Sequence, residues 1–395
     1  MKISATATLK TKKDQSIRRF HPWIFSGAIK DWEGEAKDGE IVAVKSNKGG
    51  HLGYGYFQDQ SSICIRMLTF GEEELNDDFW NNCLERAWQR REKLGLIDNP
   101  DNSLYRLVFA EGDSLPGLII DMYDNHAVLQ CYAMATYNIR ELVCDFLKSK
   151  LGDKLKSVYV KIPEYIRLAN GLENECIYGD DPDLCTATEH GTKYWINWKT
   201  GQKTGFFIDQ RDNRKFLGSL SKGKKVLNTF CYSGGFTMEA LKGGAKEVHS
   251  LDSSELALEE LEKNLALNNL VSEKHRTIKA DAMDYLKEMD TDYDIIVLDP
   301  PAFAKSISSR HKAIQGYKRL NARAIEHIKP GGIILTFSCS QVVDKFLFNS
   351  TILAAAIASG RRIQVIGQLH QPADHPFSIF HPEGEYLKGL AIQVD

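Results

Sequence analysis

Residues 225 to 236 read KVLNTFCYSGGF, and the pattern that decides the fold starts here. A strand-like run ends at Phe230, two adjacent glycines follow at Gly234 and Gly235, and a helical pattern starts at Phe236. Adjacent glycines permit a tight turn and a close approach of the backbone to a ligand. The loop matches neither G-x-G-x-x-G nor G-x-x-x-x-G-K-[ST], so a dinucleotide or a triphosphate is not the first interpretation of that ligand.

Strand-like and helical runs alternate from this stretch onward. The strand-like runs lie at 247–251, 275–280, 293–299 and 331–337, and the helical runs lie at 254–268, 282–289, 313–327 and 344–358. This alternation predicts an α/β fold with a parallel sheet and helices on both of its faces. The last two strands, 363–369 and 386–394, have no crossover helix between them, so we expect them to pair antiparallel.

The first half of the chain has a different pattern. Short strands separated by turns, such as EIVAVKS (40–46) and HLGYGYF (51–57), predict a small all-β module over residues 1–70. After an acidic break near 72–78, the runs over 105–190 predict an α+β unit. A chain of 395 residues is long for one core. We therefore expect three domains, at 1–70, 75–190 and 191–395.

Charge and composition limit the possible partners and compartments. The net charge of -3 is no signature of nucleic-acid binding, but residues 1–30 hold seven Lys and Arg against one Asp, or +6. This end either contacts phosphates or is a solvated stretch without a ligand. No apolar run is long enough to span a membrane and the N-terminus has no apolar signal region, so we expect a cytoplasmic protein without a membrane partner.

The eight cysteines are scattered without a C-x-x-C pair or a Cys/His cluster. This distribution argues against a zinc site and against a disulfide framework, so we expect no metal and reduced thiols.

Acidic residues follow three consecutive strands of the predicted α/β sheet: Asp252, Asp281 and Asp299. In such sheets ligands bind outside the carboxyl ends of the strands, and a carboxylate there can accept both ribose hydroxyls of an adenosine. Each Asp alone is as well explained as the N-cap of the next helix. Together with a first loop that lacks a phosphate cradle, however, the three acids favour S-adenosylmethionine (SAM) over NAD or ATP.

Several longer stretches resemble the bacterial 23S ribosomal RNA cytosine-C5 methyltransferase family with an N-terminal PUA domain, almost from end to end. They are HPWIFSGAI (21–29), EGDSLPGLIIDMY (111–123), KTGFFIDQRDNR (203–214), LNTFCYSGGFTMEAL (227–241), LDPPAFAKS (298–306), GYKRLN (316–321), TFSCS (336–340) and the tail 373–389. The resemblance implies a PUA domain, a central α+β (EEHEE) domain and a C-terminal Rossmann-like class I methyltransferase domain. It also implies that a cytidine of 23S ribosomal RNA, naked or in a precursor of the large ribosomal subunit, is the substrate.

The resemblance also implies roles for individual residues. Asp252 would hold the ribose and Asp281 the adenine amine. The loop of Phe230, Tyr232, Ser233, Gly234 and Gly235 would lie along the methionine portion. Phe206 and Asp209 would close the pocket, and Asn228 and Asp299 complete the predicted cofactor contacts. Asn228 stands where many other methyltransferases carry an acid, as in this family's own pattern.

Cys339 in TFSCS is the predicted nucleophile. Carbon 5 of cytosine is a poor nucleophile, and addition of a thiolate at carbon 6 converts the ring into an enamine. Asp299, at the neighbouring strand end, is expected to bind the cytosine N3 or amino edge. The target base must be splayed out of its RNA, and Phe303, Tyr317 and Phe377 either flank it or belong to the core.

Three alternatives stay open at this point. In the first, Cys339 is a small buried core residue, as free cysteines often are. The enzyme methylates a guanine or adenine nitrogen of RNA, in which case the thiol is incidental. The protein binds SAM and RNA without catalysis.

Overall fold

The computed structural model describes residues 1–59, 61–289, 291–304 and 306–395. Two compact units make up the chain. Unit 1 comprises Met1–Thr188, Ile196–Phe206 and Ala373–Gly384, and unit 2 comprises Glu189–Trp195, Phe207–Pro372 and Glu385–Asp395. Lys305, within the LDPPAFAKS stretch, lies outside the described residues.

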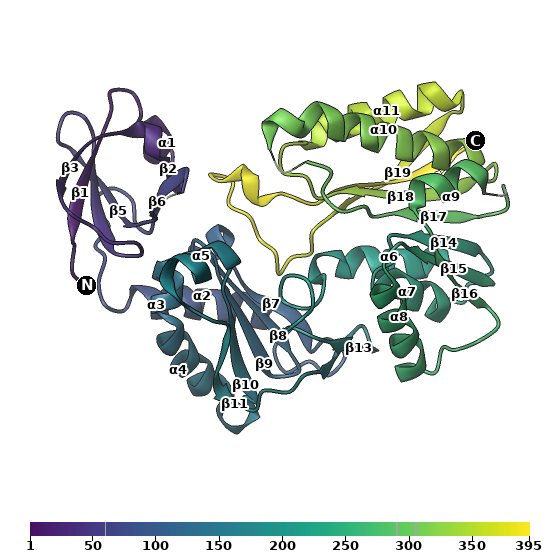
Figure 1. The fold of residues 1–395 in the computed structure, drawn as a ribbon, viewed down its shortest axis with the longest axis horizontal. Coiled ribbons are helices and arrows are strands. Elements are labelled where there is room, and N and C mark those ends of the chain that lie inside the picture. The colour runs from purple at the N-terminus through teal and green to yellow at the C-terminus, as the bar shows by residue number, and fades with distance from the viewer. Residues whose placement is uncertain (60, 290, 305) are drawn as a thin grey trace. The chain divides into compact units, whose positions relative to one another are not determined.

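The N-terminal part of unit 1 is a six-stranded sheet with the order β2-β6-β5-β4-β1-β3 (Figure 1). Its elements are β1 (Ala5–Leu9), α1 (Gln15–Arg18), β2 (Trp23–Phe25), β3 (Ile29–Gly34), β4 (Ile41–Lys45), β5 (His51–Phe57) and β6 (Ile63–Met67). Burial alternates along β1, because successive side chains of a strand point to opposite faces. The inward side chains, among them Ala7, Val42, Val44 and Ile65, form the core of this module.

A second sheet of unit 1 has the order β11-β10-β9-β8-β7. The elements are α2 (Phe79–Lys93), β7 (Leu104–Phe109), β8 (Leu118–Tyr123), β9 (His126–Cys131), α3 (Met134–Asn138), α4 (Arg140–Leu151), β10 (Ser157–Lys161), α5 (Glu164–Asn170) and β11 (Glu175–Gly179). Strands β9 and β10 are parallel, and α4 lies between them in the chain. The apolar side chains of α2 and α4 share one core with this sheet.

Residues Ala373–Gly384, here called the C-terminal strap, belong to unit 1 although they lie close to the end of the chain. Asp374 is fully buried, and its carboxylate accepts a hydrogen bond from the Arg106 backbone N–H at 2.9 Å. The Arg91 guanidinium donates to the Asp374 carbonyl at 2.6 Å. In Figure 1 the strap is the yellow segment that lies beside the N-terminal sheet, where Phe380 contacts Phe20. Long-range polar contacts therefore fix the strap inside unit 1.

Unit 2 is built on a seven-stranded sheet with the order β16-β15-β14-β17-β18-β20-β19. Its strands are β14 (Lys225–Thr229), β15 (Glu247–Asp252), β16 (His275–Lys279), β17 (Ile295–Leu298), β18 (Gly332–Ser338), β19 (Ile363–His370) and β20 (Lys388–Val394). Strands β14 to β18 are mutually parallel, whereas β20 pairs antiparallel with both β18 and β19. The strands β12 (Cys185–Glu189) and β13 (Thr192–Ile196) precede this sheet in the chain.

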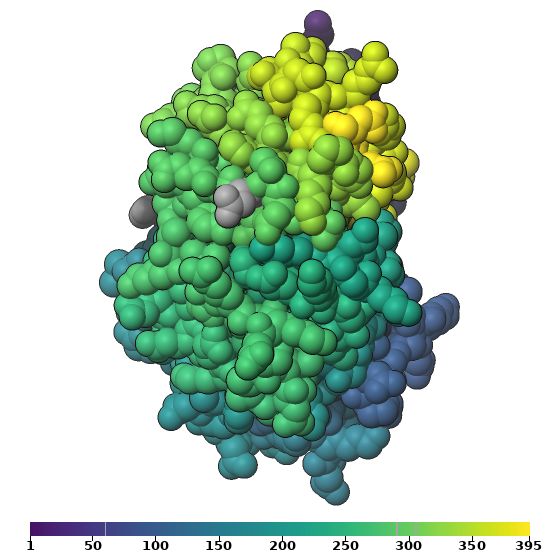
Figure 2. All heavy atoms as spheres, turned by 90° about the vertical axis from the view of Figure 1, so that its right-hand side faces the viewer, coloured from purple at the N-terminus to yellow at the C-terminus, as the bar shows by residue number. Residues whose placement is uncertain are grey.

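Helices cover both faces of the seven-stranded sheet (Figure 1). They are α6 (Arg211–Leu220), α7 (Gly235–Lys242), α8 (Glu255–Leu267), α9 (Ala282–Glu288), α10 (Arg310–His327) and α11 (Lys345–Ser359). Helices α9, α10 and α11 pack on one face and α6 and α7 on the other. Figure 2 shows an outer face of unit 2, where teal residues around α6 lie next to yellow C-terminal residues. The Asn213 side chain donates to the His370 carbonyl at 3.2 Å at this junction.

The predicted α/β fold class is confirmed, including the antiparallel pairing of the last two strands. Strands β1, β2 and β3 are present in addition to the strands expected in the N-terminal module. The division at 1–70, 75–190 and 191–395 stays a prediction. Among the described residues, no helix is both long and apolar enough to cross a membrane.

Candidate active site

The first five parallel strands end along one edge of the sheet, here called the carboxyl edge. Asn228 lies near the end of β14, Asp252 ends β15, and Asp281 comes two residues after β16. Asp299 directly follows β17, and Cys339 directly follows β18. Strand β17 pairs with β14 on one side and with β18 on the other. The topology thus places the predicted site residues of these strands at one edge, where sheets of this class bind ligands.

The loop after β14 has an unusual backbone. Phe230, Tyr232 and Gly234 have φ values of 53°, 47° and 86°, in the left-handed region that non-glycine residues seldom adopt. The Cys231 backbone N–H donates to the Leu251 carbonyl at 3.0 Å, and Asn264 donates to the Ser233 carbonyl at 2.9 Å. Strained conformations of this kind persist where the surroundings over-determine them, and they gather at functional sites.

The two glycines of this loop are required by packing inside the protein. A Cβ at Gly234 would lie 2.8 Å from Leu261 Cγ, and a Cβ at Gly235 would lie 2.8 Å from Arg214 Cδ. The tight turn expected from the sequence is present at Gly234. Because both residues lack a side chain, Leu261 lies close to the backbone of Gly234 and Arg214 lies close to that of Gly235.

Asp252 and Asp281 are held differently. The Asp252 carboxylate is half-buried and accepts hydrogen bonds from the Tyr232 N–H at 3.0 Å and the Ser254 N–H at 2.9 Å. It therefore ties the strained loop to the end of β15. The Asp281 carboxylate is exposed and caps α9, since it accepts from Met283 N–H at 2.8 Å and Asp284 N–H at 3.2 Å. Asp281 thus serves as the N-cap that the sequence left open as an alternative.

Asn228 offers a direct test of whether a cofactor with an amino group fits here. Its side-chain nitrogen donates to Thr237 Oγ1 at 2.9 Å, and its residue is 1% exposed. Within the described ranges of the chain, its Oδ1 is buried without a hydrogen-bond partner. Buried acceptors are normally satisfied. The α-ammonium group of SAM is a donor of the kind that this oxygen lacks.

The segment before α6 contributes Asp209. This residue is buried and accepts a hydrogen bond from the Tyr386 hydroxyl at 2.6 Å. Its neighbour Phe207 contacts Tyr232 of the strained loop, with ring centroids 5.2 Å apart. Phe206 is also buried but belongs to unit 1. The structure therefore brings the segment around Asp209 to the loop after β14 within unit 2.

A buried ion pair between Arg214 and Glu189 holds the segment before α6. Arg214 donates to both carboxylate oxygens of Glu189 at 2.6 Å and to the Phe207 carbonyl at 3.0 Å. The Arg214 carbon chain also packs against Gly235. Arg214, Glu189 and Tyr386 were not singled out by the sequence reasoning, although Arg214 lies in the quoted KTGFFIDQRDNR stretch.

The TFSCS segment, residues 336–340, is held by a network of hydroxyl groups. Ser340 is buried, and its Oγ lies 3.0 Å from the Tyr317 hydroxyl and accepts from the Ala304 N–H at 3.4 Å. The Lys388 ammonium donates to the Ser340 carbonyl at 2.9 Å. Cys339 is half-buried, whereas the serines on both sides of it are buried. The network thus connects this segment to the loop that begins with Asp299.

The expected aromatic partners of a base have different environments. Tyr317 is fully buried and bonded to Ser340, so it belongs to the core and its hydroxyl network. Phe303 is half-buried and packs on Tyr317 with a centroid distance of 4.6 Å. Phe377 is exposed and lies in the C-terminal strap of unit 1.

The second cysteine of this region is chemically different from Cys339. Cys231 is buried, and burial raises the pKa of its thiol well above the ordinary value. A thiol that stays protonated is a poor nucleophile. Burial thus favours a packing role for Cys231 over a nucleophilic one.

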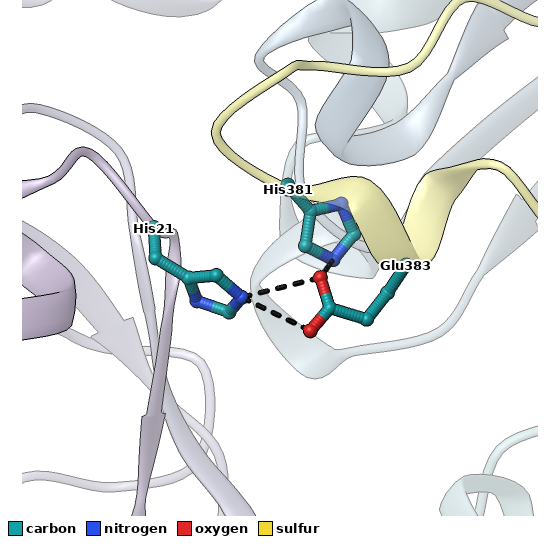
Figure 3. Close-up of side chains that lie close together, drawn as sticks. All are labelled: His21, His381 and Glu383. Carbon is teal, nitrogen blue, oxygen red and sulfur yellow. Dashed lines mark hydrogen bonds and ion pairs between the residues drawn. The ribbon is translucent and has the colours of Figure 1, made fainter. Parts of the chain in front are cut away.

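One trio of side chains in the described residues has the composition of a metal site. It consists of His21, His381 and Glu383, whose ligand atoms lie within 4.8 Å of one another (Figure 3). The His21 Nε2 lies 3.3 Å from both Glu383 oxygens, but its Nδ1 accepts a hydrogen bond from the Trp23 N–H at 3.2 Å. A ring whose Nδ1 accepts carries its proton on Nε2, which then donates to Glu383 and has no lone pair for a metal. The trio is therefore arranged as a hydrogen-bonded contact between the N-terminal module and the strap.

Two family models match the chain. A PUA-like domain matches residues 7–70, and an S-adenosylmethionine-dependent methyltransferase matches residues 168–378. The curated relatives include the ribosomal RNA large subunit methyltransferase I of Pseudoalteromonas atlantica, 39% identical over 99% of this chain and 100% of that protein. The enzyme of the same name from Aeromonas hydrophila is 38% identical with the same coverage.

Solved structures share the fold of the whole chain. A SAM-dependent methyltransferase described from Streptococcus mutans has a TM-score of 0.83, 22% identity, and covers 98% of this chain and 99% of its own. A methyltransferase structure complexed with SAH has a TM-score of 0.84, 22% identity, and covers 99% of this chain and 100% of its own. At this identity the likeness is one of fold.

Proposed function

Since the chain belongs to the SAM-dependent ribosomal RNA large subunit methyltransferase I family, we propose that it methylates carbon 5 of a cytidine in 23S ribosomal RNA, with the Cys339 thiolate as nucleophile. One observation supports carbon 5, and not a nitrogen, as the methylated atom. A half-buried cysteine, Cys339, directly follows β18, and β18 pairs with the strand that leads to Asp299. Methylation of a nitrogen needs no thiol. A thiol at the carboxyl edge is what carbon methylation requires.

The proposed chemistry assigns each group one task. SAM, when bound, supplies a methyl group on a positively charged sulfur. The Cys339 thiolate forms a bond to carbon 6 of the cytosine, and the electron pair of the 5,6 double bond moves to carbon 5. Carbon 5 then takes the methyl group and SAH leaves. Loss of the carbon 5 proton to a base and expulsion of the thiolate restore the double bond, so the enzyme ends unchanged.

The other residues of the site bind and orient. Asp252 is held by two backbone N–H groups. In the proposed complex its carboxylate accepts hydrogen bonds from the ribose hydroxyls. Asn228 Oδ1 accepts from the amino group of the cofactor, and the loop Phe230–Gly235 lies along its methionine portion. Asp281 contributes the oxygen that does not cap α9, and Asp209 closes the pocket within unit 2. Asp299 binds the N3 or amino edge of the cytosine.

The basic N-terminal module is proposed to bind the ribosomal RNA. Seven Lys and Arg against one Asp in residues 1–30 provide phosphate contacts, which supply much of the affinity for RNA and make it salt-dependent. The match to a PUA-like domain over residues 7–70 supports this assignment.

Trapping with 5-fluorocytidine tests the mechanism. Fluorine at carbon 5 blocks the final proton loss, so the RNA stays joined to Cys339. Full-length protein is incubated with SAM and 23S RNA that carries 5-fluorocytidine, and the adduct is detected on a denaturing gel. We expect an adduct in the unchanged protein and none in Cys339→Ala. Cys176→Ala, a half-exposed cysteine of β11 in unit 1, is the control and should form it normally.

Labelled methyl groups distinguish the alternatives. Unmodified 23S RNA is incubated with radioactive SAM and digested to nucleosides. Label in 5-methylcytidine supports the proposal. Label in a purine nucleoside with full activity in Cys339→Ala would show nitrogen methylation, and SAM binding without any label in RNA would show a non-catalytic protein.

A further inference from the structure

Lys388 is a buried cation next to the TFSCS segment. It begins β20 and pairs in register with Ser338, the residue before Cys339. Lys388 is 5% exposed. Its Nζ donates to the carbonyl of Ser340, the residue after Cys339, at 2.9 Å. The backbone of Lys388 therefore lies opposite the residue before Cys339, and its ammonium group is bonded to the residue after Cys339.

The charges around Lys388 leave it without a close anion in the described part of the chain. No carboxylate there lies within 4.0 Å of its Nζ. Cys339 raises the pKa of Lys388 more than Glu385 before β20 or Asp344 before α11 does. Burial lowers the pKa of Lys388 to about 8. Burial of a cation beside neutral partners raises the free energy of the folded state, and an anion at this position would reduce that cost.

Cys339 is the group whose ionisation provides that anion. Two other titratable groups belong to neighbouring elements. Asp299 directly follows β17, the strand that pairs with β18. Tyr317 of α10 is fully buried and hydrogen-bonded to Ser340, and burial raises the pKa of its hydroxyl. A thiolate next to an ammonium group is the arrangement that activates cysteines in other enzymes. Other cysteines of the chain are placed differently, since burial raises the pKa of Cys64 and Cys83 to about 11 and of Cys131 and Cys185 to about 12.

We propose that Lys388 is a positioning residue that stabilises the Cys339 thiolate and fixes the TFSCS segment through the Ser340 carbonyl. The inference rests on the proposed function, because it assigns Lys388 to the nucleophile of that reaction. Lys388 acts through Cys339 and needs no contact with the RNA base. Its effect is to increase the fraction of Cys339 that is ionised before RNA binds.

The pH dependence of thiol alkylation tests this proposal without RNA or SAM. Full-length protein is treated with iodoacetamide between pH 6 and 10, and the rate at Cys339 is followed by mass spectrometry of its peptide. In the unchanged protein we expect a midpoint below the ordinary value of about 8.5. In Lys388→Met we expect the midpoint to rise by about one pH unit or more, which makes alkylation at pH 7 roughly tenfold slower.

Two further variants separate charge from structure. Lys388→Arg keeps the positive charge and should stay within about threefold of the unchanged protein at pH 7. Lys345→Met removes an exposed lysine at the start of α11 and should leave the midpoint where it was. If Lys388→Met does not fold, the midpoint of the unchanged protein and that of Lys388→Arg decide the question.

An unchanged midpoint in folded Lys388→Met, or a midpoint at or above about 8.5 in the unchanged protein, would overturn the proposal. The outcome is separate from that of the trapping experiment. A lowered midpoint that depends on Lys388, together with no 5-fluorocytidine adduct, would reject cytosine methylation while leaving the thiolate assignment in place. An adduct together with a midpoint independent of Lys388 would support cytosine methylation and reject the role proposed for Lys388.

Discussion

At the scale of single residues, Arg91 is a buried charge of unit 1 with hydrogen-bond partners in several segments. It is fully buried, donates to both oxygens of Asp113 at 2.7 and 2.8 Å, and donates to the carbonyls of Arg106 and Asp374. Removal of one partner of a buried pair leaves the other charge without compensation. The guanidinium therefore joins α2, β7 and the C-terminal strap through one set of hydrogen bonds.

We expect Arg91→Ala to lower the free energy of unfolding by about 3–5 kcal/mol, because the buried Asp113 loses its buried counter-ion and keeps only the half-exposed Arg90. Urea denaturation followed by tryptophan fluorescence measures the change. Arg90→Ala is the matched control, since Arg90 also pairs with Asp113 but its side chain is 42% exposed. Exposed pairs contribute at most about 1 kcal/mol. Equal losses in the two variants would contradict the importance assigned to burial.

The placement of residues at the carboxyl edge could be predicted from the sequence, because it depends on position along a strand. Asp252, Asp299 and Cys339 were singled out because they follow strands, and the sheet brings those strand ends to one edge. Lys388 was not singled out, although a lysine inside the apolar run YLKGLAIQV is a visible signal. Its role depends on the antiparallel register of β20 against β18, which the sequence does not specify.

At the scale of elements, the alternation of strands and helices in unit 2 was predictable because each element has its own hydrophobic period. The C-terminal strap was not. Its hydrogen-bond partners, the Arg106 N–H and the Arg91 guanidinium, lie 268 and 283 positions away in the chain. Local patterns carry no information about such pairings, and the strap itself contains only the short η6 turn, Pro382–Gly384.

The strap passes very close to Gly112. A Cβ at this position would lie 1.8 Å from the Pro376 carbonyl oxygen, so Gly112→Ala must displace the strap backbone. We expect chymotrypsin to cleave at Phe377 or Phe380 of the strap at least about tenfold faster in this variant, since overpacking costs about 1–3 kcal/mol. Cleavage is followed by mass spectrometry of the native protein.

Gly27→Ala provides the control for this experiment, because a Cβ at Gly27 meets no atom within 4 Å. It should be cleaved at the rate of the unchanged protein. If Gly112→Ala is cleaved no faster than Gly27→Ala, the strap is not held by this contact.

At the scale of the whole molecule, buried histidines connect stability to pH. Burial lowers the pKa of five of them: His126, His190, His249, His275 and His381. In the native state each therefore takes up a proton at a lower pH than in the unfolded chain, where protonation occurs near pH 6.5. Stability is therefore lost as the pH falls below about 6.5, until the folded-state pKa is reached. Each histidine contributes a slope of at most about 1.4 kcal/mol per pH unit.

His126 allows this dependence to be measured for one residue. Its Nδ1 lies 2.8 Å from Ser157 Oγ, and the residue is 8% exposed. We expect His126→Gln to flatten the fall in unfolding free energy between pH 6.5 and 5.5, whatever its effect at pH 7.5. His311→Gln, at an exposed position of α10, should keep the original slope. Burial raises the pKa of carboxyl groups such as Glu239, and protonation of such groups increases stability as the pH falls. This contribution is the same in the variants and in the unchanged protein, so it cancels when their slopes are compared.

The position of the strap also has a consequence for how the chain is made. Unit 1 contains the first 188 residues but also residues up to Gly384, eleven before the C-terminus at Asp395. N-terminal domains generally fold first during synthesis. Here the Arg91 guanidinium and the Arg106 N–H receive their partner Asp374 only after Phe207–Pro372 of unit 2 have been synthesised. A nascent chain that ends before Asp374 lacks this partner, so unit 1 is completed only after most of unit 2 has been made.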